Sequence, residues 1–328
     1  TGRMYDHVCA YGRRKKRFCQ GTDTQMFRER DTHKKRTAFV KKNGRNAIVF
    51  QARTVGRSCV AAKKVVPVLT EVLRSGYYPD DSNRRIINEE YHQYIFIQED
   101  RFKLLSGVAR MNKGKSHFNG DNFLISRLEC GKAIAAIADG MGSGKRAYIE
   151  SRMVIELMEN CIDAGFDEKA SIDLINSAYI AGGGTGNPVT MDMSVIDCQS
   201  GYMHCMKLGA VSTFIRRDKW VEIIQSTTLP MGVLEQVDYD CTTKKLYDGD
   251  YIVMVSDGVL DNIPCVNKEE RMAQMIHALT IREPSAMAEK LLEQSLAYND
   301  MKASDDCTVL VLGLFDTCLL YTSPSPRD

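Results

Sequence analysis

The 328-residue chain is predicted to have an α+β fold, an α/β sandwich of two stacked, mostly antiparallel sheets flanked by helices, preceded by a small partial α+β segment. Two observations predict it. Strand-like and helical runs come in blocks, in the order strands, two helices, many strands, two helices and one strand. Short turns join several strand runs, which is typical of antiparallel hairpins. Strict alternation of strands and helices would instead indicate a doubly wound parallel sheet.

The composition divides the chain into four parts. Residues 1–46 are basic and weakly periodic, and we predict disorder or short helical fragments there. Residues 47–102 are predicted to form the small partial α+β segment, and residues 103–316 the main domain. Residues 317–328 continue no pattern and are predicted to be a non-native tail, so they are left out of the fold argument.

The small segment has few elements. Ala47–Ala52 and Tyr91–Ile97 are predicted to be strands. Between them, apolar residues at helical spacing predict a helix over Val60–Arg74, with Pro67 kinking it near its middle. Ser75 and Gly76 then mark the end of that helix.

The main domain contains apolar runs of strand length and two pairs of amphipathic runs. Helices are expected at Arg146–Ala164, ended by Gly165, at 167–180 with Asp167 as N-cap, at Glu269–Thr280 and at Ser285–Tyr298. The predicted strands are Phe102–Arg110, Phe123–Leu128, Ala133–Ala138, Met191–Cys198, Tyr202–Leu208, Ser212–Arg216, Trp220–Ile224, Tyr239–Leu246, Tyr251–Val255 and Cys307–Phe315.

Charge is unevenly placed although the net charge is only +2. Residues 1–64 hold 18 Lys and Arg against 4 Asp and Glu, whereas the remainder is acidic. A basic arm suits an anionic lipid surface, an acidic partner or nucleic acid. A solvated linker is the equally weighted alternative, and nucleic acid ranks last, so we expect no nucleic-acid partner.

The cysteine pattern and the length of the apolar runs bear on the cellular compartment in which the chain is expected. The 11 cysteines show no Cys-x-x-Cys pair, which indicates reduced thiols in the cytoplasm and no structural zinc site. No run approaches the roughly 18 apolar residues of a membrane span. The chain begins with Thr, so we expect a fragment whose preceding region is missing.

Acidic residues stand where apolar strands end. Asp121 follows Gly120, Asp139 precedes Gly140, Asp257 precedes Gly258, and the pair Asp305-Asp306 precedes the last apolar run. Clustered, buried carboxylates repel one another unless a cation lies between them. Oxygen ligands without His or Cys select hard ions such as Mg²⁺ or Mn²⁺.

Four converging acids suit two metal ions about 3.5–4 Å apart, which can activate a water molecule against a phosphate ester. The alternative interpretation is that each Asp-Gly is only a turn at a strand end. That interpretation is plausible for any one site and poor for all of them together.

Other polar residues receive a weaker assignment. Asp192, on an apolar strand, has two interpretations, facing solvent or supporting the site, and the solvent-facing one is preferred. His204 and Cys205 are neighbours on one strand, so their side chains point to opposite faces and do not form a catalytic pair. Residues 182–186 are glycine-rich and are predicted to form a mobile loop. No arginine is evident as a phosphate clamp.

The acidic motifs, in their order along the chain, resemble those of the metal-dependent Ser/Thr phosphatases of the PP2C type. Asp139-Gly-Met-Gly-x-Gly-x-x-Ala147 is similar to the stage II sporulation protein E group within that family, as is the run Lys207 to Ile215. Leu229-Pro-Met-Gly232 adds to the similarity. The resemblance covers residues 103–316 well and residues 47–102, similar to a regulatory region, less specifically.

The resemblance implies a PP2C-like sandwich and a ligand set for two Mn²⁺ or Mg²⁺ ions. Asp121 would bridge both ions, and Asp139 with the Gly140 carbonyl would bind one of them. Asp257 and Asp305 would complete the other site. Asp306 is the weaker candidate of its pair, because many relatives have Asn there. Asp121, Asp139 and Asp257 would also be the catalytic residues.

The resemblance also implies a function and partners. The substrate would be a phosphoserine of a small anti-anti-sigma factor protein, whose dephosphorylation activates a sigma factor during sporulation. The other expected partners are the cell-division machinery, a membrane reached through the missing N-terminal region at the division septum, and a second copy in a homodimer. Two alternatives stay open: a stress-response phosphatase with another phosphoprotein target, and a septal or membrane scaffold whose phosphatase fold is inactive.

Overall fold

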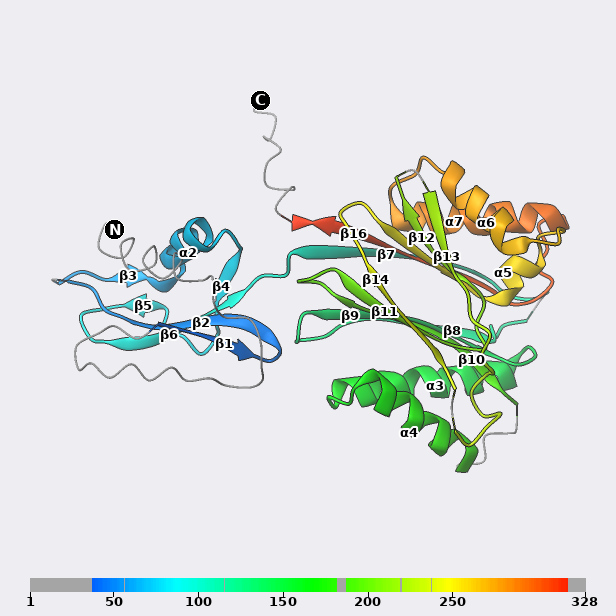
Figure 1. Ribbon diagram of the computed structural model, residues 1–328, viewed down its shortest axis with the longest axis horizontal. Coiled ribbons are helices and arrows are strands. Elements are labelled where there is room, and N and C mark those ends of the chain that lie inside the picture. Colours follow the sequence, from blue (N-terminus) through cyan, green and yellow to red (C-terminus); the bar gives the residue numbers. More distant parts are fainter. Residues whose placement is uncertain are drawn as a thin grey trace. The chain divides into compact units, whose positions relative to one another are not determined.

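The computed structural model describes residues 37–55, 57–114, 116–181, 187–218, 220–236 and 238–317. The chain divides into two compact units, one ending at Arg101 and including residues 129–131, the other holding the rest from Phe102 onward. Both are drawn in Figure 1. The tail at 318–328 and most of the basic segment at 1–46 lie outside the described residues.

The first unit is a small antiparallel sheet covered by a helix. Its strands β1 (Thr37–Lys42), β2 (Arg45–Ala52), β6 (His92–Gln98) and β4 (Tyr77–Pro79) lie in that order. A short pair, β3 (Val60–Ala61) and β5 (Ile86–Ile87), precedes and follows the helical part, η2 (Ala62–Val65) and α2 (Val66–Leu73). Leu69, Tyr94 and Phe96 are fully buried in its core.

Two local predictions for this unit are wrong. We predicted no regular structure before Ala47, whereas β1 pairs with β2 through a turn at Asn43 and Gly44, which both have positive φ. Pro67 does not kink a helix: it lies in the first turn of α2, where its missing N–H costs no hydrogen bond. The helix ends at Arg74, which adopts the left-handed conformation.

The second unit is built from two five-stranded antiparallel sheets. The first sheet runs β14 (Asp240–Lys245), β11 (Tyr202–Leu208), β10 (Val189–Asp197), β9 (Lys132–Gly140) and β8 (Asp121–Arg127). The second runs β13 (Trp220–Ile224), β12 (Thr213–Arg217), β15 (Tyr251–Val255), β16 (Cys307–Asp316) and β7 (Phe102–Met111). The sheets stack face to face, with helices outside both (Figure 1).

Helices α3 (Lys145–Asp163) and α4 (Glu168–Ala181) cover the outer face of the first sheet. Helices α5 (Asp257–Asp261), α6 (Lys268–Ala278) and α7 (Pro284–Leu296), followed by η3 (Ala297–Asn299), cover the second. Between the sheets lies a third apolar layer that includes Ile137, Cys205 and Met254. The two-sheet sandwich flanked by helices matches the predicted architecture.

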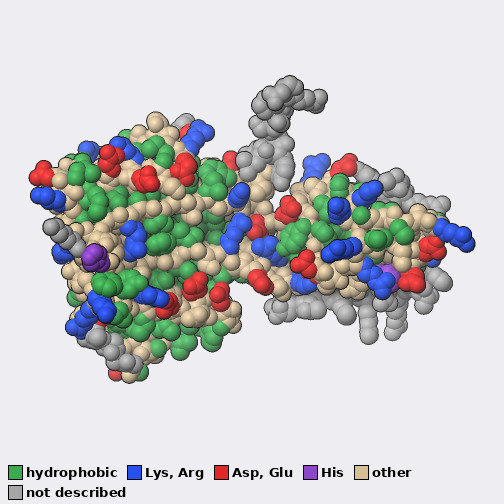
Figure 2. All heavy atoms as spheres, turned by 180° about the vertical axis from the view of Figure 1, so that it is seen from behind, with side chains coloured by type: hydrophobic (Ala, Val, Ile, Leu, Met, Phe, Trp, Pro, Cys, Tyr) green, Lys and Arg blue, Asp and Glu red, His purple; other side chains and the backbone are tan. Residues whose placement is uncertain are grey.

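The surface of this unit carries no single dominant charge on the face seen in Figure 2, where acidic, basic and hydrophobic side chains are interspersed. Within the described part of the chain, no helix combines the length and the apolar character that a membrane crossing needs.

Candidate functional site

The acids singled out from the sequence come together at one end of the inter-sheet layer. Asp121 is the first residue of β8 and lies directly opposite Asp139 of β9 in the antiparallel pair. Asp257 begins α5, with one residue between it and the end of β15, and Asp305 lies two residues before β16. Side chains of directly opposite residues share a face of the sheet, so two carboxylates meet there, which is unfavourable without a cation.

Asp121 is the centre of this cluster. Its side chain is fully buried, and neither carboxylate oxygen accepts a hydrogen bond from the described residues. Burial raises the pKa of Asp121 to about 7; the nearby Thr308 and Ser256 hydroxyls reduce the rise, and the Asp257 and Asp306 carboxylates add to it. A buried carboxylate normally has its oxygens satisfied. The Arg110 guanidinium lies within electrostatic reach, but it donates to the backbone carbonyl of Asp121 and leaves both carboxylate oxygens without a hydrogen bond from the described residues.

Asp139 and Asp257 share this environment. Burial raises the pKa of Asp139 to about 10, and the charges of Asp121, Asp257 and Asp305 raise it further. Burial likewise raises the pKa of Asp257, with repulsion from Asp261 and Asp305 added. A hydrogen bond between the Asp139 and Asp257 carboxyl groups raises the pKa of Asp139 and lowers that of Asp257, which places these two acids side by side.

Among the described residues, no group of three or more His, Cys, Asp or Glu side chains is arranged so that it could hold a metal ion as it stands. The acids approach one another in pairs: Asp121 lies opposite Asp139 across two strands, and Asp139 and Asp257 line one cavity. A cation is the partner that fits an orphaned, buried carboxylate beside other carboxylates, and an all-oxygen donor set suits a hard divalent ion.

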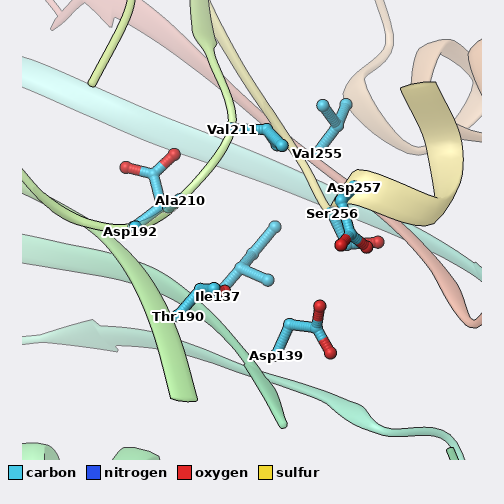
Figure 3. Close-up of a pocket in the computed structure, with 10 residues that line it drawn as sticks. Ile137, Asp139, Thr190, Asp192, Ala210, Val211, Val255, Ser256 and Asp257 are labelled. Carbon is cyan, nitrogen blue, oxygen red and sulfur yellow. The ribbon is translucent and has the colours of Figure 1, made fainter. Parts of the chain in front are cut away.

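A small cavity of about 40 Å³ lies beside these acids. Figure 3 shows Asp139 and Asp257 on one side of it and Asp192 with Ala210 on another. Its lining residues are Ile137, Asp139, Thr190, Asp192, Gly209, Ala210, Val211, Val255, Ser256 and Asp257. The cavity holds no more than a few water-sized groups, so a larger substrate would reach the acids from outside.

The glycines next to the acids are required by close packing. A Cβ on Gly140 would lie 2.3 Å from the backbone oxygen of Ala147, and one on Gly258 would lie 2.1 Å from that of Asp306. Neither glycine has a positive φ. The interpretation of these Asp-Gly pairs as simple turns is therefore wrong: the glycines let backbone segments approach each other around the acids.

Asp305 and Asp306 have different surroundings. The buried Asp306 carboxylate accepts hydrogen bonds from the backbone N–H groups of Gly120 and Lys113, both at 2.7 Å. Asp305 is partly exposed and lies 3.4 Å from the Lys113 ammonium group. Asp306 thus ties the β7–β8 connection to β16 through both of its oxygens, whereas the hydrogen bonds that the Asp305 carboxylate accepts from described residues, from Lys113 and from the Asp306 N–H, go to Oδ1 alone.

Further hydrogen bonds fix the frame of the site. The Ser256 hydroxyl accepts from the Thr308 N–H at 2.9 Å, which joins the start of α5 to β16. The Arg110 guanidinium donates to the backbone carbonyl of Asp121. Arg110 had no assignment from the sequence, because nothing local indicates that β7 and β8 meet at this edge.

The preferred prediction for Asp192 is wrong. We predicted that it faces solvent, but it is 2% exposed, lines the cavity and lies 2.7 Å from the ammonium group of Lys207. The opposite charges on two consecutive apolar strands were the available signal for such a pair. Cys205 is buried whereas its neighbour His204 is exposed, so the two side chains lie on opposite faces of the strand, as predicted. The glycine-rich loop at 182–186 lies outside the described residues.

Comparison with known families matches the model for stage II sporulation protein E (SpoIIE) over residues 130–315, more than half of the chain. The chain belongs to the SpoIIE family. It is 30% identical to stage II sporulation protein E of Bacillus subtilis over 251 residues, and 30% identical to that of Priestia megaterium over 253 residues. These stretches cover 76% and 77% of this chain but only 30% and 43% of those proteins.

Among solved structures, the chain is similar to the PP2C phosphatase domain and regulatory-domain fragment of the cell fate determinant SpoIIE from Bacillus subtilis. The TM-score is 0.69 at 27% identity, covering 86% of this chain and 83% of that one. The predicted fold class, a PP2C-like α+β sandwich, is confirmed.

Proposed function

We propose that this SpoIIE-family chain is a metal-dependent protein-serine phosphatase that uses two Mn²⁺ or Mg²⁺ ions. The observation that carries the proposal is the Asp121 carboxylate, buried and without a hydrogen-bond partner among the described residues, directly across β8–β9 from Asp139. Such an arrangement is costly unless a cation joins it. Membership of a phosphatase family makes hydrolysis of a phosphate ester the natural chemistry.

In the proposed site, Asp121 would bridge the two ions. Asp139 and the backbone carbonyl of Gly140 would hold one, and Asp257 with Asp305 would complete the other. When bound, such ions supply a nucleophilic water and neutralise the phosphoryl oxygens. Asp305 is the better ligand candidate than Asp306, whose oxygens are already engaged by two backbone N–H groups.

The chain's own residues contribute placement and proton control. Close packing at Gly140 and Gly258 holds the backbone beside Asp139 and Asp257 in place. The Asp306 carboxylate accepts a hydrogen bond from the backbone of Gly120 and so fixes the chain just before Asp121. The raised pKa values keep part of the cluster protonated before a cation enters. The described residues show no basic side chain lining the cavity. The phosphoryl group would then be held mainly by the cations, and affinity for small phosphate esters would be weak.

The proposed substrate is a phosphoserine on a small anti-anti-sigma factor, whose release activates a sigma factor in sporulation. The proposed partners beyond it are the cell-division machinery, a membrane through a region outside this chain, and a second copy of the chain. The substrate and these partners are proposed from membership of the family alone. The chain spans less than half the length of the curated relatives it matches.

The test is a Mn²⁺-titrated phosphatase assay on a phosphorylated anti-anti-sigma factor, with p-nitrophenyl phosphate as the small ester. Asp139→Asn and Asp257→Asn should abolish the metal-dependent rate, whereas Asp173→Asn, a matched change on the exposed face of α4, should leave it intact. Full activity in EDTA, or in both site variants, would refute the metal mechanism.

The same assay separates the alternatives. Turnover of a different phosphoprotein with no turnover of the anti-anti-sigma factor would assign the chain to another signalling pathway. Tight turnover of p-nitrophenyl phosphate, comparable with the phosphoprotein, would contradict recognition by a separate docking surface. Absence of any metal-dependent hydrolysis would favour a scaffold.

A further inference from the structure

A buried ion pair lies beside the acid cluster, within the otherwise apolar layer between the two sheets. Asp192 and Lys207 are direct cross-strand neighbours on β10 and β11, and their side chains are 3% and 1% exposed. The ammonium nitrogen of Lys207 lies 2.7 Å from Asp192 Oδ2, and the Thr213 hydroxyl donates to the same oxygen. A charged pair in such a place is not needed for packing, because apolar residues of similar size are often at least as stable.

Lys207 makes a second contact that reaches the wall of the cavity. Its ammonium group donates to the backbone carbonyl of Val211 at 2.6 Å. Gly209, Ala210 and Val211 form part of that wall. The other end of this short loop is fixed where the Gly209 N–H donates to the Thr228 hydroxyl at 3.2 Å. The loop is therefore held at both ends, once by Thr228 and once by Lys207.

Asp192 lines the same cavity as Asp139 and Asp257, so three carboxylates border one small space. Asp139 and Asp257 remain available to a cation, whereas Asp192 is paired with Lys207. A carboxylate released into this space would be one more oxygen donor for a hard ion. The number of acids available to the metals thus depends on a lysine that does not itself line the cavity.

We propose that Lys207 is a positioning residue of the phosphatase site: it keeps Asp192 out of the metal ligand set and holds the Gly209–Val211 wall in place. This inference rests on the proposed function and deepens it. Without Lys207, Asp192 keeps only neutral donors among the described residues, the Thr213 hydroxyl and the Cys205 thiol, so its charge is uncompensated and it can act as an additional ligand. Divalent ions then bind more tightly but in an arrangement less suited to hydrolysis.

The test compares Lys207→Met, Asp192→Asn and the double variant with the unaltered chain. Mn²⁺ binding is measured by calorimetry, kcat and KM on a phosphoserine protein, and the amide exchange of residues 209–212 by mass spectrometry. Lys207→Met should tighten Mn²⁺ binding by about threefold or more, the scale of one added charge nearby, while kcat falls by about tenfold. The double variant should return Mn²⁺ affinity to that of the unaltered chain, while the 209–212 amides still exchange faster.

A merely structural role predicts something different: Mn²⁺ affinity that is unchanged or weaker in Lys207→Met, and no restoration in the double variant. Either result would overturn the proposal.

Should Lys207→Met fail to fold, the double variant decides alone. Unchanged amide exchange at residues 209–212 in that variant would show that Lys207 does not hold the Gly209–Val211 wall in place. If the unaltered chain itself binds no Mn²⁺, the proposed function has failed, whereas normal binding there with no change in the variants removes only the role of Lys207.

Discussion

Filling the acid cluster with two divalent ions at pH 7 should release between one and two protons. The pKa of Asp139 is raised to about 10, so this group is almost fully protonated at pH 7. The pKa of Asp121 is raised to about 7, so it is half protonated. Because ligands must be ionised to bind a metal, binding removes between about one and two protons from these two groups together.

The same competition makes affinity depend steeply on pH. Competition with the proton on Asp139 makes metal binding about 100-fold weaker at pH 6 than at pH 8. Competition with the proton on Asp121 makes it about tenfold weaker again. The overall binding constant for two ions should therefore rise about 1000-fold over this range, an increase that the ordinary pKa of an aspartate could not produce.

Proton release is measured by titration calorimetry in two buffers of different ionisation enthalpy at pH 7. Asp139→Asn should lower the released number by about one, since it removes the group that is fully protonated. Binding without proton release, together with an affinity that is flat from pH 6 to pH 8, would refute the reasoning.

The free energy of unfolding of the metal-free protein should fall as pH rises, whereas the affinity for metal ions rises with pH. An acid whose pKa is higher in the folded state than in the unfolded chain binds more protons when folded. Its contribution to stability is therefore complete below about pH 4 and is lost as pH rises toward 7 for Asp121 and 10 for Asp139. Each such proton changes the free energy of unfolding by at most about 1.4 kcal/mol per pH unit. Denaturant unfolding in EDTA at pH 5 and pH 8 checks the sign, and a metal-free protein more stable at pH 8 would contradict it.

Four substitutions test individual parts of the frame. Asp306→Asn replaces one of two acceptor oxygens by a donor that faces a backbone N–H, so it should lower the free energy of unfolding by about 1–2 kcal/mol. Asp305→Asn should leave denaturant unfolding nearly unchanged but weaken Mn²⁺ binding by about tenfold or more, and the reverse pattern would exchange the two roles. Gly140→Ala brings a methyl group against the Ala147 carbonyl and should cost about 1–3 kcal/mol in thermal unfolding while abolishing activity, whereas normal stability would show that the close approach is not needed. Asn176→Ala removes the hydrogen bonds that join α4 to residues 232, 234 and 235, and should cost about 2 kcal/mol; unchanged unfolding would show that water replaces them.

Local patterns predicted the elements around the site well. Apolar runs that end in an acid and a glycine identified β9 and β15, and the block order of strands and helices predicted the sandwich. The reason is that strand ends and close backbone approaches impose residue types locally. The position of Asp121 opposite Asp139 required in addition that β8 and β9 pair in one register, which the short turn between them favoured.

Partners that are distant along the chain could not be predicted in this way. Asp192 was placed toward solvent because alternation alone does not reveal a buried Lys207 on the next strand. The separation of Asp305 from Asp306 depends on two backbone N–H groups almost 200 residues earlier in the chain. Pro67 was read as a kink because the start of α2 is set by the packing of the preceding turn, not by its own periodicity.

The central claim is that Asp121, Asp139, Asp257 and Asp305 converge on a pair of hard cations. The most direct measurement is anomalous diffraction from crystals of this chain soaked in Mn²⁺. We predict two adjacent peaks, one within ligand distance of Asp139 and the other of Asp257, with Asp121 reaching both. Peaks elsewhere on the molecule, or none at saturating Mn²⁺, would contradict it.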